Sequence, residues 1–274
     1  MEPIAVILPV YKKDHPDWVR LSIESVIKQD YDSFKVYIGV DGPVGEELML
    51  VLMGLGEHEQ VKIAWFKENR GLACVLNDLL DKAFADGFQY IARMDADDVS
   101  MPGRFAKQMQ YLKEHPEIDV VGGAITEIDE NGNSRGKTII YPESPEECRS
   151  FFSRRNPHAH PAVLFQKSFF DKLGGKKYRP EYRQNQDTML WFDGMMIGTV
   201  HANIPEVVLL FRVTDTMFKQ RRNGWAFAKK QLQDRLIINK SLGYGVSSYL
   251  FAYAMFVMLV SPSWIKRIAY KVFR

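Results

Sequence analysis

The chain runs Phe88-Gln89-Tyr90-Ile91-Ala92 and, after one more residue, Met94-Asp95-Ala96-Asp97-Asp98. The apolar part predicts a strand over 90–94, which places three carboxylates at its carboxyl end. Like charges a few Å apart repel, and each would be neutralised unless a cation, hydrogen bonds or water compensated it. Hard oxygen ligands suit Mg²⁺ or Mn²⁺, often together with a bound phosphate. An acidic turn capping a helix that begins near Pro102 explains the same residues equally well, so the surrounding chain decides.

Apolar runs alternate with segments of helical spacing on both sides of this stretch. The expected strands are 4–10, 34–40, 61–66 and 90–94, and the expected helices are 18–29, 46–55 and 72–85. This alternation predicts an α/β fold with a parallel, doubly wound sheet. Further along we expect a helix at 104–113, strands at 120–124 and 162–165, a hairpin turn at 130–133 and a helix over 188–192.

Ligands of such sheets bind beyond the carboxyl ends of the strands. The polar residues expected there are Tyr11, Asp41, Asn69-Arg70-Gly71 and Asp95 to Asp98, which suit a nucleotide and its metal ion. The sequence has no Gly-x-Gly-x-x-Gly turn and no Walker A loop, which argues against a dinucleotide-dependent dehydrogenase and a P-loop enzyme.

The combination of these motifs resembles the family 2 glycosyltransferases, which are inverting enzymes of GT-A fold that use nucleotide-diphosphate sugars. The resemblance covers residues 3–215. Its marks are Leu8-Pro9-Val10-Tyr11, Asp41-Gly42, Asn69-Arg70-Gly71-Leu72-Ala73, Asp95-Ala96-Asp97 and Gln186-Asp187. The sequence is most similar to the bacterial branch that builds capsule, O-antigen and exopolysaccharide, and His158-Ala159-His160-Pro161 resembles part of that subgroup's pattern.

The resemblance implies a Rossmann-like GT-A catalytic domain over 1–215, with a nucleotide-sugar half at about 1–98 and an acceptor half at about 99–215. It also implies that Asp97 binds Mn²⁺ or Mg²⁺ directly, while Asp95 touches both the ribose and the metal. Asp98 would lie behind these ligands or cap a helix. The residues expected to bind the nucleotide are Pro9, Val10, Tyr11, Asp41, Asn69, Arg70, Asp95 and Ala96.

Inversion needs one displacement and one base that takes the proton of the acceptor hydroxyl. The resemblance assigns this role to Asp187, although an acid in the first turn of a helix is also stabilised by the helix dipole. His158 and His160 would bind a metal or the acceptor, or make structural hydrogen bonds. Trp191 would stack on an acceptor sugar or belong to the core.

Four basic residues at or after the end of the predicted acceptor half could contact the diphosphate, because arginine forks suit phosphate oxygens. They are Arg212, Lys219, Arg221 and Arg222. The last three could instead belong to a basic surface that faces lipid.

Residues 216–274 carry eleven basic side chains and one acid, Asp234. Such a tail can meet nucleic acid or anionic lipid. The uncharged run 246–260, followed by Trp264 and four cations, favours lipid and gives no indication of nucleic-acid binding. The run is shorter than the roughly 20 residues that span a bilayer. We therefore expect a helical extension that lies on the membrane surface, or else docks on the protein or in a homodimer.

Cys74 and Cys148 match no metal-ligand spacing, and residues 1–10 lack a secretory signal, so we expect a cytoplasmic protein on the inner face of the plasma membrane. Its expected activity is the metal-dependent, inverting transfer of a sugar from a nucleotide-diphosphate donor to a polyprenyl-diphosphate-linked saccharide. UDP is expected as the carrier in preference to GDP. A polyprenyl-phosphate sugar synthase and a catalytically silent, nucleotide-sugar-binding scaffold are the alternatives.

Overall fold

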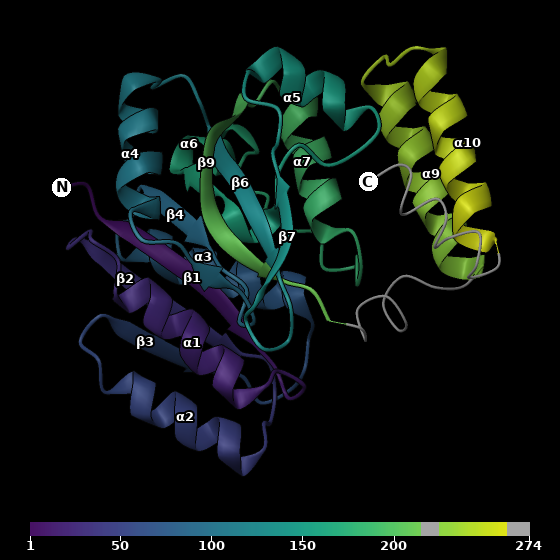
Figure 1. The fold of residues 1–274 in the computed structure, drawn as a ribbon. Coiled ribbons are helices and arrows are strands. Elements are labelled where there is room, and N and C mark those ends of the chain that lie inside the picture. The colour runs from purple at the N-terminus through teal and green to yellow at the C-terminus, as the bar shows by residue number, and fades with distance from the viewer. Residues whose placement is uncertain (215–224, 262–274) are drawn as a thin grey trace.

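The computed structural model describes residues 1–214 and 225–261. Its centre is a nine-stranded sheet in the order β3-β2-β1-β4-β8-β6-β9-β5, with β7 paired to β6 (Figure 1). The strands are β1 (Ile4–Val10), β2 (Phe34–Val40), β3 (Val61–Trp65), β4 (Tyr90–Arg93), β5 (Val99–Ser100), β6 (Val120–Ile128), β7 (Ser134–Ile139), β8 (Leu164–Gln166) and β9 (His201–Arg212).

The first four strands, β1 to β4, pair in parallel, as the alternation of strands and helices predicts. The other half of the sheet is mixed. β8 runs antiparallel to both β4 and β6, and β5 runs antiparallel to β9, whereas β6 and β9 are parallel. The predicted α/β fold with a mostly parallel sheet flanked by helices is confirmed, and the antiparallel pairs lie in the second half.

Both faces of the parallel half are covered, which explains why β1 is apolar throughout. Ile4, Val6 and Leu8 pack into the core on one face, and Ala5 and Ile7 pack into the core on the other. The covering helices are α1 (Pro16–Ile27), α2 (Glu46–Gly56), α3 (Leu72–Ala85), α4 (Arg104–Glu114), α5 (Pro145–Phe152), α6 (Lys167–Lys172) and α7 (Gln186–Met196), with a short 3₁₀ turn, η1 (His160–Ala162).

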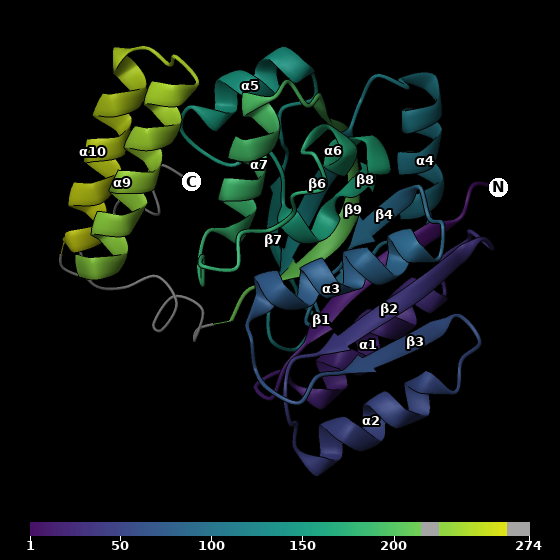
Figure 2. The ribbon, with the colours of Figure 1, turned by 180° about the vertical axis from the view of Figure 1, so that it is seen from behind.

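Two further helices, α9 (Trp225–Ser241) and α10 (Val246–Val260), pack side by side at the margin of the molecule (Figures 1 and 2). α10 has the bounds of the predicted uncharged run. α9 contacts the rest of the protein through Arg235, whose guanidinium donates to the carbonyl of Phe152 and lies 5.3 Å from the centre of that ring. Within the described ranges no helix is both long and apolar enough to cross a membrane. The division into domains at residue 215 stays a prediction.

β9 is absent from the sequence-based assignment, and it positions the site more than any other unpredicted element. It pairs with β6 along most of its length and ends at Arg212, which reaches the acidic loop that follows β4. β5, a two-residue strand within that loop, pairs with β9 through Val99 and Leu210. The loop is therefore held between β4 and β9.

Candidate active site

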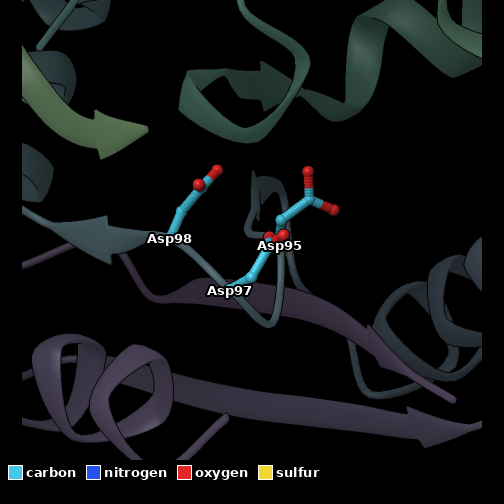
Figure 3. Close-up of side chains that lie close together, drawn as sticks. All are labelled: Asp95, Asp97 and Asp98. Atoms are coloured by element: carbon cyan, nitrogen blue, oxygen red, sulfur yellow. The ribbon is translucent and has the colours of Figure 1, made fainter. Parts of the chain in front are cut away.

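Three carboxylates converge in the loop after β4 (Figure 3). One oxygen from each of Asp95, Asp97 and Asp98 lies within 4.8 Å of the others. Asp98 is buried, whereas Asp95 and Asp97 are partly exposed. The cluster therefore extends from the buried Asp98 toward solvent. Its oxygen atoms are hard ligands, which suit Mg²⁺ or Mn²⁺.

Repulsion between the three carboxylates acts most strongly on Asp98. Burial, followed by the charges of Asp97 and Asp95, raises the pKa of Asp98 well above its ordinary value. The N–H of Arg212 donates to Oδ1 at 2.8 Å, which opposes this shift. Oδ2 is buried and has no hydrogen-bond partner among the described residues. A divalent cation would relieve the repulsion between the three charges, so the residues present fit one.

Arg93 compensates part of the negative charge of the cluster. This residue was not predicted from the sequence. It is only 2% exposed, its Nη2 forms an ion pair with Asp95, and its Nε and Nη1 have no partner in the described part of the chain. The hydroxyl of Ser22 also donates to the Asp95 carbonyl at 2.8 Å. The ion pair could have been predicted from the sequence. Arg93 is the one cation in an apolar strand, and a buried cation needs a partner such as one of the three acids that follow it.

We expect Arg93→Met to lower the free energy of unfolding by about 2 kcal/mol, because Asp95 would lose its buried counter-ion. Removing one partner of a fully buried pair costs about 3–5 kcal/mol, and the Asp95 side chain is 31% exposed, which reduces the effect. Urea unfolding measures the change. Arg20→Met, at an exposed position of α1, is the matched control. Equal stability of the two variants would show that Arg93 compensates nothing.

Asp41 lies directly after β2 and organises the neighbouring loop. Its Oδ1 accepts from the N–H of Arg70 at 2.8 Å, and its Oδ2 accepts from the N–H of Gly71 at 2.9 Å. Asn69 donates to the Asp41 carbonyl at 3.1 Å. Gly71 has φ +93°, a left-handed conformation that favours glycine, immediately before α3. Two predicted nucleotide-binding segments thus meet through the Asp41 carboxylate.

Arg70 extends from this loop toward solvent. Its guanidinium forms an ion pair with Asp78, which raises the pKa of Arg70, and lies 4.8 Å from the centre of the Phe66 ring. Arg183 donates to the Arg70 carbonyl at 2.8 Å. The loop after β3 is therefore tied to the segment that precedes α7.

The end of β1 lies beside Asp41. Val10 pairs with Val40, so Tyr11 and Asp41 follow neighbouring strands at the same edge of the sheet. Pro9 and Tyr11 are partly exposed, Val10 and Ala96 are buried, and the Tyr11 N–H donates to Asp14 at 2.8 Å. The predicted nucleotide-binding residues thus gather at the carboxyl edge of β1, β2 and β4. Their individual contacts with a nucleotide stay predictions.

Asp187 lies in the first turn of α7 and is held by Asn156. The side-chain amide of Asn156 donates to Asp187 Oδ2 at 2.8 Å and to the Thr188 hydroxyl at 3.0 Å. Asn185, just before the helix, has φ 62° and donates to Asp234 of α9 at 3.3 Å. Asp234 is 2% exposed. Helix α9 therefore orders the segment that carries the predicted base. Sequence spacing alone could not connect Asn156 or Asp234 to Asp187.

His158 and His160 lie in the core. Their exposed fractions are 2% and 8%. His158 contacts Asn203 at 2.8 Å and His201 at 3.0 Å through its two ring nitrogens, and His160 contacts the Tyr178 hydroxyl at 2.7 Å. This burial and these contacts fit the structural hydrogen-bonding alternative, and a metal or acceptor contact at either histidine stays a prediction.

Trp191 is fully buried beside these histidines. Its ring centre lies 5.1 Å from that of His158 and 5.7 Å from that of Phe165. A side chain enclosed in this way does not stack on an acceptor sugar. The core alternative therefore holds for Trp191.

We expect stability to fall as the pH drops below about 6.5. Burial lowers the pKa of His158 to about 4 and the pKa values of His160 and His201 well below the ordinary value. The unfolded chain therefore binds protons that the folded chain excludes, so stability is full above pH 6.5 and is lost as the pH falls toward 4. Each histidine should cost about 1 kcal/mol between pH 6.5 and 5.5.

Urea unfolding at pH 7.5, 6.5 and 5.5 measures this loss. His58→Gln, at an exposed position, should keep the same pH dependence as the wild type. Stability that stays constant between pH 6.5 and 5.5 would contradict the neutral, buried state of the three histidines.

Arg212 is buried and holds the acidic loop. Its Nε donates to the Asp97 carbonyl at 2.7 Å, its Nη1 donates to the Asp129 carbonyl at 2.9 Å, and its guanidinium carbon lies 4.9 Å from the centre of the Trp18 ring. Two of its three nitrogens thus bind backbone carbonyls, and a contact of Arg212 with the diphosphate stays a prediction. The other predicted diphosphate contacts, Lys219, Arg221 and Arg222, lie outside the described residues.

The fold and site thus define an α/β protein. At the edge of its sheet lies an acidic loop whose carboxylates could hold a metal ion. A sequence model described as "Glycosyl transferase family 2" matches residues 5–174, which is more than half of the chain. The chain therefore belongs to glycosyl transferase family 2 and is a glycosyltransferase.

Two named relatives are similar over most of their length. The amylovoran biosynthesis glycosyltransferase AmsE of Erwinia amylovora is 31% identical over 84% of this chain and 83% of its own. The Escherichia coli UDP-Gal:alpha-D-GlcNAc-diphosphoundecaprenol beta-1,3-galactosyltransferase is 26% identical over 84% of this chain and 80% of its own. These relatives confirm the resemblance to the bacterial branch that builds surface polysaccharides.

Solved structures show the same fold. S. aureus TarS, residues 1–349 in complex with UDP-GlcNAc, matches with a TM-score of 0.66 and 13% identity over 97% of this chain and 83% of that one. The mannosyltransferase PcManGT of Pyrobaculum calidifontis, in complex with GDP-Man and Mn²⁺, matches with a TM-score of 0.63 and 14% identity over 99% of this chain and 79% of that one.

Proposed function

We propose that the protein transfers a sugar from a UDP-sugar to a hydroxyl group of a polyprenyl-diphosphate-linked saccharide in surface-polysaccharide biosynthesis, using Mn²⁺ or Mg²⁺. The observation that carries the proposal is the convergence of Asp95, Asp97 and Asp98, whose ligand oxygens lie within 4.8 Å of one another. This convergence lies at the edge where Tyr11, Asp41 and the loop around Arg70 also meet.

The relatives support the choice of substrates. The E. coli relative is named for a UDP-sugar donor and an acceptor carried on diphosphoundecaprenol. The TarS complex contains UDP-GlcNAc, and the P. calidifontis complex contains GDP-Man with Mn²⁺. UDP is therefore the preferred carrier for this chain, and Mn²⁺ is the first ion to test.

The chemistry requires stabilisation of a leaving diphosphate. A divalent cation held by Asp97 and Asp95 would neutralise the negative charge that develops on the phosphates. Asp187 takes the proton of the acceptor hydroxyl, and Asn156 keeps its carboxylate in one orientation. One displacement from the face opposite the diphosphate inverts the configuration at the anomeric carbon.

The outer face of α10 supports a location at the inner face of the plasma membrane. Val246, Leu250, Tyr253 and Val257 are exposed by 76%, 67%, 51% and 60%. Their spacing of three or four residues puts them on one side of the helix. An apolar face followed in the sequence by cations is the composition of helices that lie on anionic membranes.

A panel of UDP- and GDP-sugars with a synthetic polyprenyl-diphosphate-linked sugar tests the proposal. We expect transfer from one UDP-sugar in Mn²⁺ and none in EDTA. Transfer only from a GDP-sugar would overturn the choice of donor, and transfer to bare polyprenyl phosphate would favour the sugar synthase. Binding of UDP without turnover on any acceptor would favour the silent scaffold.

A further inference from the structure

A large groove separates the catalytic part of the protein from the C-terminal helices. Its volume is about 1090 Å³. One wall is formed by 140–143, α5 and 153–155, and the other by 244–248 and Phe251 at the beginning of α10. The walls meet where the Tyr244 hydroxyl donates to the Arg149 carbonyl. Figures 1 and 2 show α5 facing the α9–α10 pair at this place.

Two residues of the groove directly precede the residue that holds the predicted base. Arg154 and Arg155 line the groove and are followed by Asn156, whose amide donates to Asp187 at 2.8 Å. Successive Cα atoms are about 3.8 Å apart. The backbone of Arg155 is therefore one residue away from a side chain in contact with Asp187.

The charges along the groove are segregated. Arg154 and Arg155 follow the carboxyl end of α5, whereas Glu143 and Glu147 lie at its amino end. Glu147 is part of a capping box, in which its carboxylate accepts from the Ser144 N–H at 3.2 Å. An anionic group is therefore better stabilised beside Arg154 and Arg155 than beside Glu143 and Glu147. Arginine side chains bind phosphate oxygens with particularly strong hydrogen bonds.

The lining also contains aromatic side chains, interspersed with serines. Phe151, Tyr244 and Phe251 line the groove together with Ser150, Ser153, Ser247 and Ser248. Phe251 belongs to α10, on which Leu250 and Tyr253 are exposed by 67% and 51%. A molecule with an anionic head and a long apolar chain complements the two arginines, the aromatic side chains and this apolar surface.

We propose that this groove binds the diphosphate and the first isoprene units of the lipid-linked acceptor. The diphosphate contacts Arg154 and Arg155, the saccharide extends toward Asp187, and the hydrocarbon chain passes Phe251 toward the outer face of α10. This inference rests on the proposed function, because it names the site of the acceptor for the same reaction. It also assigns a role in substrate binding to the C-terminal helices.

Two acceptors test the groove: the same sugar on a polyprenyl diphosphate, and on a neutral alkyl chain of equal length. The double variant Arg154→Ala/Arg155→Ala should lose about tenfold or more in kcat/KM with the diphosphate acceptor, as expected for lost hydrogen bonds to a charged group. Transfer to the neutral acceptor and affinity for UDP with Mn²⁺ should stay unchanged. Arg20→Ala, at an exposed position of α1, should behave as the wild type.

A second variant, Ser247→Trp, fills the groove without removing charge and should raise KM for the long-chain acceptor alone. Equal losses on both acceptors, or no loss, would overturn the groove as the diphosphate site. If the wild type transfers sugar to neither acceptor, the proposed function fails. The groove is then judged by direct titration of the diphosphate acceptor in detergent, where unchanged affinity of the double variant would overturn it.

Discussion

Asp97→Ala is expected to lower kcat/KM for sugar transfer about a thousandfold, which corresponds to roughly 4 kcal/mol of lost transition-state stabilisation. The reason is the proposed metal site: Asp97 would supply one of few protein ligands to a cation whose task is to neutralise the leaving diphosphate. Asp95 already pairs with Arg93, and Asp98 accepts from the Arg212 N–H, so neither carboxylate makes up for the ligand lost with Asp97.

The measurement combines steady-state transfer with titration of Mn²⁺ in the presence of UDP. Asp97→Ala should weaken binding of Mn²⁺ and of UDP together, because each helps to hold the other. Asp171→Ala, at an exposed acid on α6, is the matched control and should change neither. Full activity of Asp97→Ala in Mn²⁺, or wild-type activity that persists in EDTA, would contradict the assignment of the acidic loop.

Asp187→Asn is expected to lower kcat by a factor of about 10² to 10⁴, the range typical for loss of a general base. The amide keeps the size of the side chain but cannot take the proton of the acceptor hydroxyl. Because the proposed partner of Asp187 is the acceptor hydroxyl and not the nucleotide, affinity for UDP with Mn²⁺ should stay at the wild-type value. Asn156→Ala should give a smaller loss, since it removes only the donor that orients Asp187.

The size of the effect separates the two kinds of acceptor. A large loss in Asp187→Asn, with a smaller one in Asn156→Ala, would support a base at Asp187. A mild effect of Asp187→Asn would instead favour a polyprenyl-phosphate acceptor, whose anionic oxygen needs no strong base. Asp193→Asn, on the same helix but paired with Arg179, controls for changes in the stability of α7.

Local patterns were sufficient to predict the parallel half of the fold. β1, β2 and β4 are short apolar runs that end in polar residues, and their order follows from the alternation with helices. α10 is bounded by the turn at Gly245 and by Ser261 and has the predicted limits. In these segments the secondary structure depends mainly on residues close in sequence.

The mixed half could not be predicted, because its pairing depends on distant segments. β8 is only three residues long, and its antiparallel orientation follows from its position between β4 and β6. β9 contains the apolar run 207–211, which was a usable signal, but no local feature indicated that it would pair with β6.

The charged motifs of the site could be predicted from the sequence, but the residues that hold them in place could not. Asp95, Asp97 and Asp41 stand out as acids after strands, and the structure brings the segments that carry them to one edge of the sheet. Arg93, Asn156 and Asp234 act through contacts between segments far apart in sequence. The contacts of the two histidines were also beyond local patterns, because their partners His201 and Tyr178 lie in other segments of the chain.

The anomeric configuration of the product tests the central claim most directly. The wild type would be incubated with the UDP-sugar selected from the panel, Mn²⁺ and the lipid-diphosphate acceptor, and the new linkage would be determined by proton NMR. A single displacement assisted by Asp187 predicts that an α-linked donor gives a β-linked product. A product that retains the α configuration would contradict the proposed mechanism.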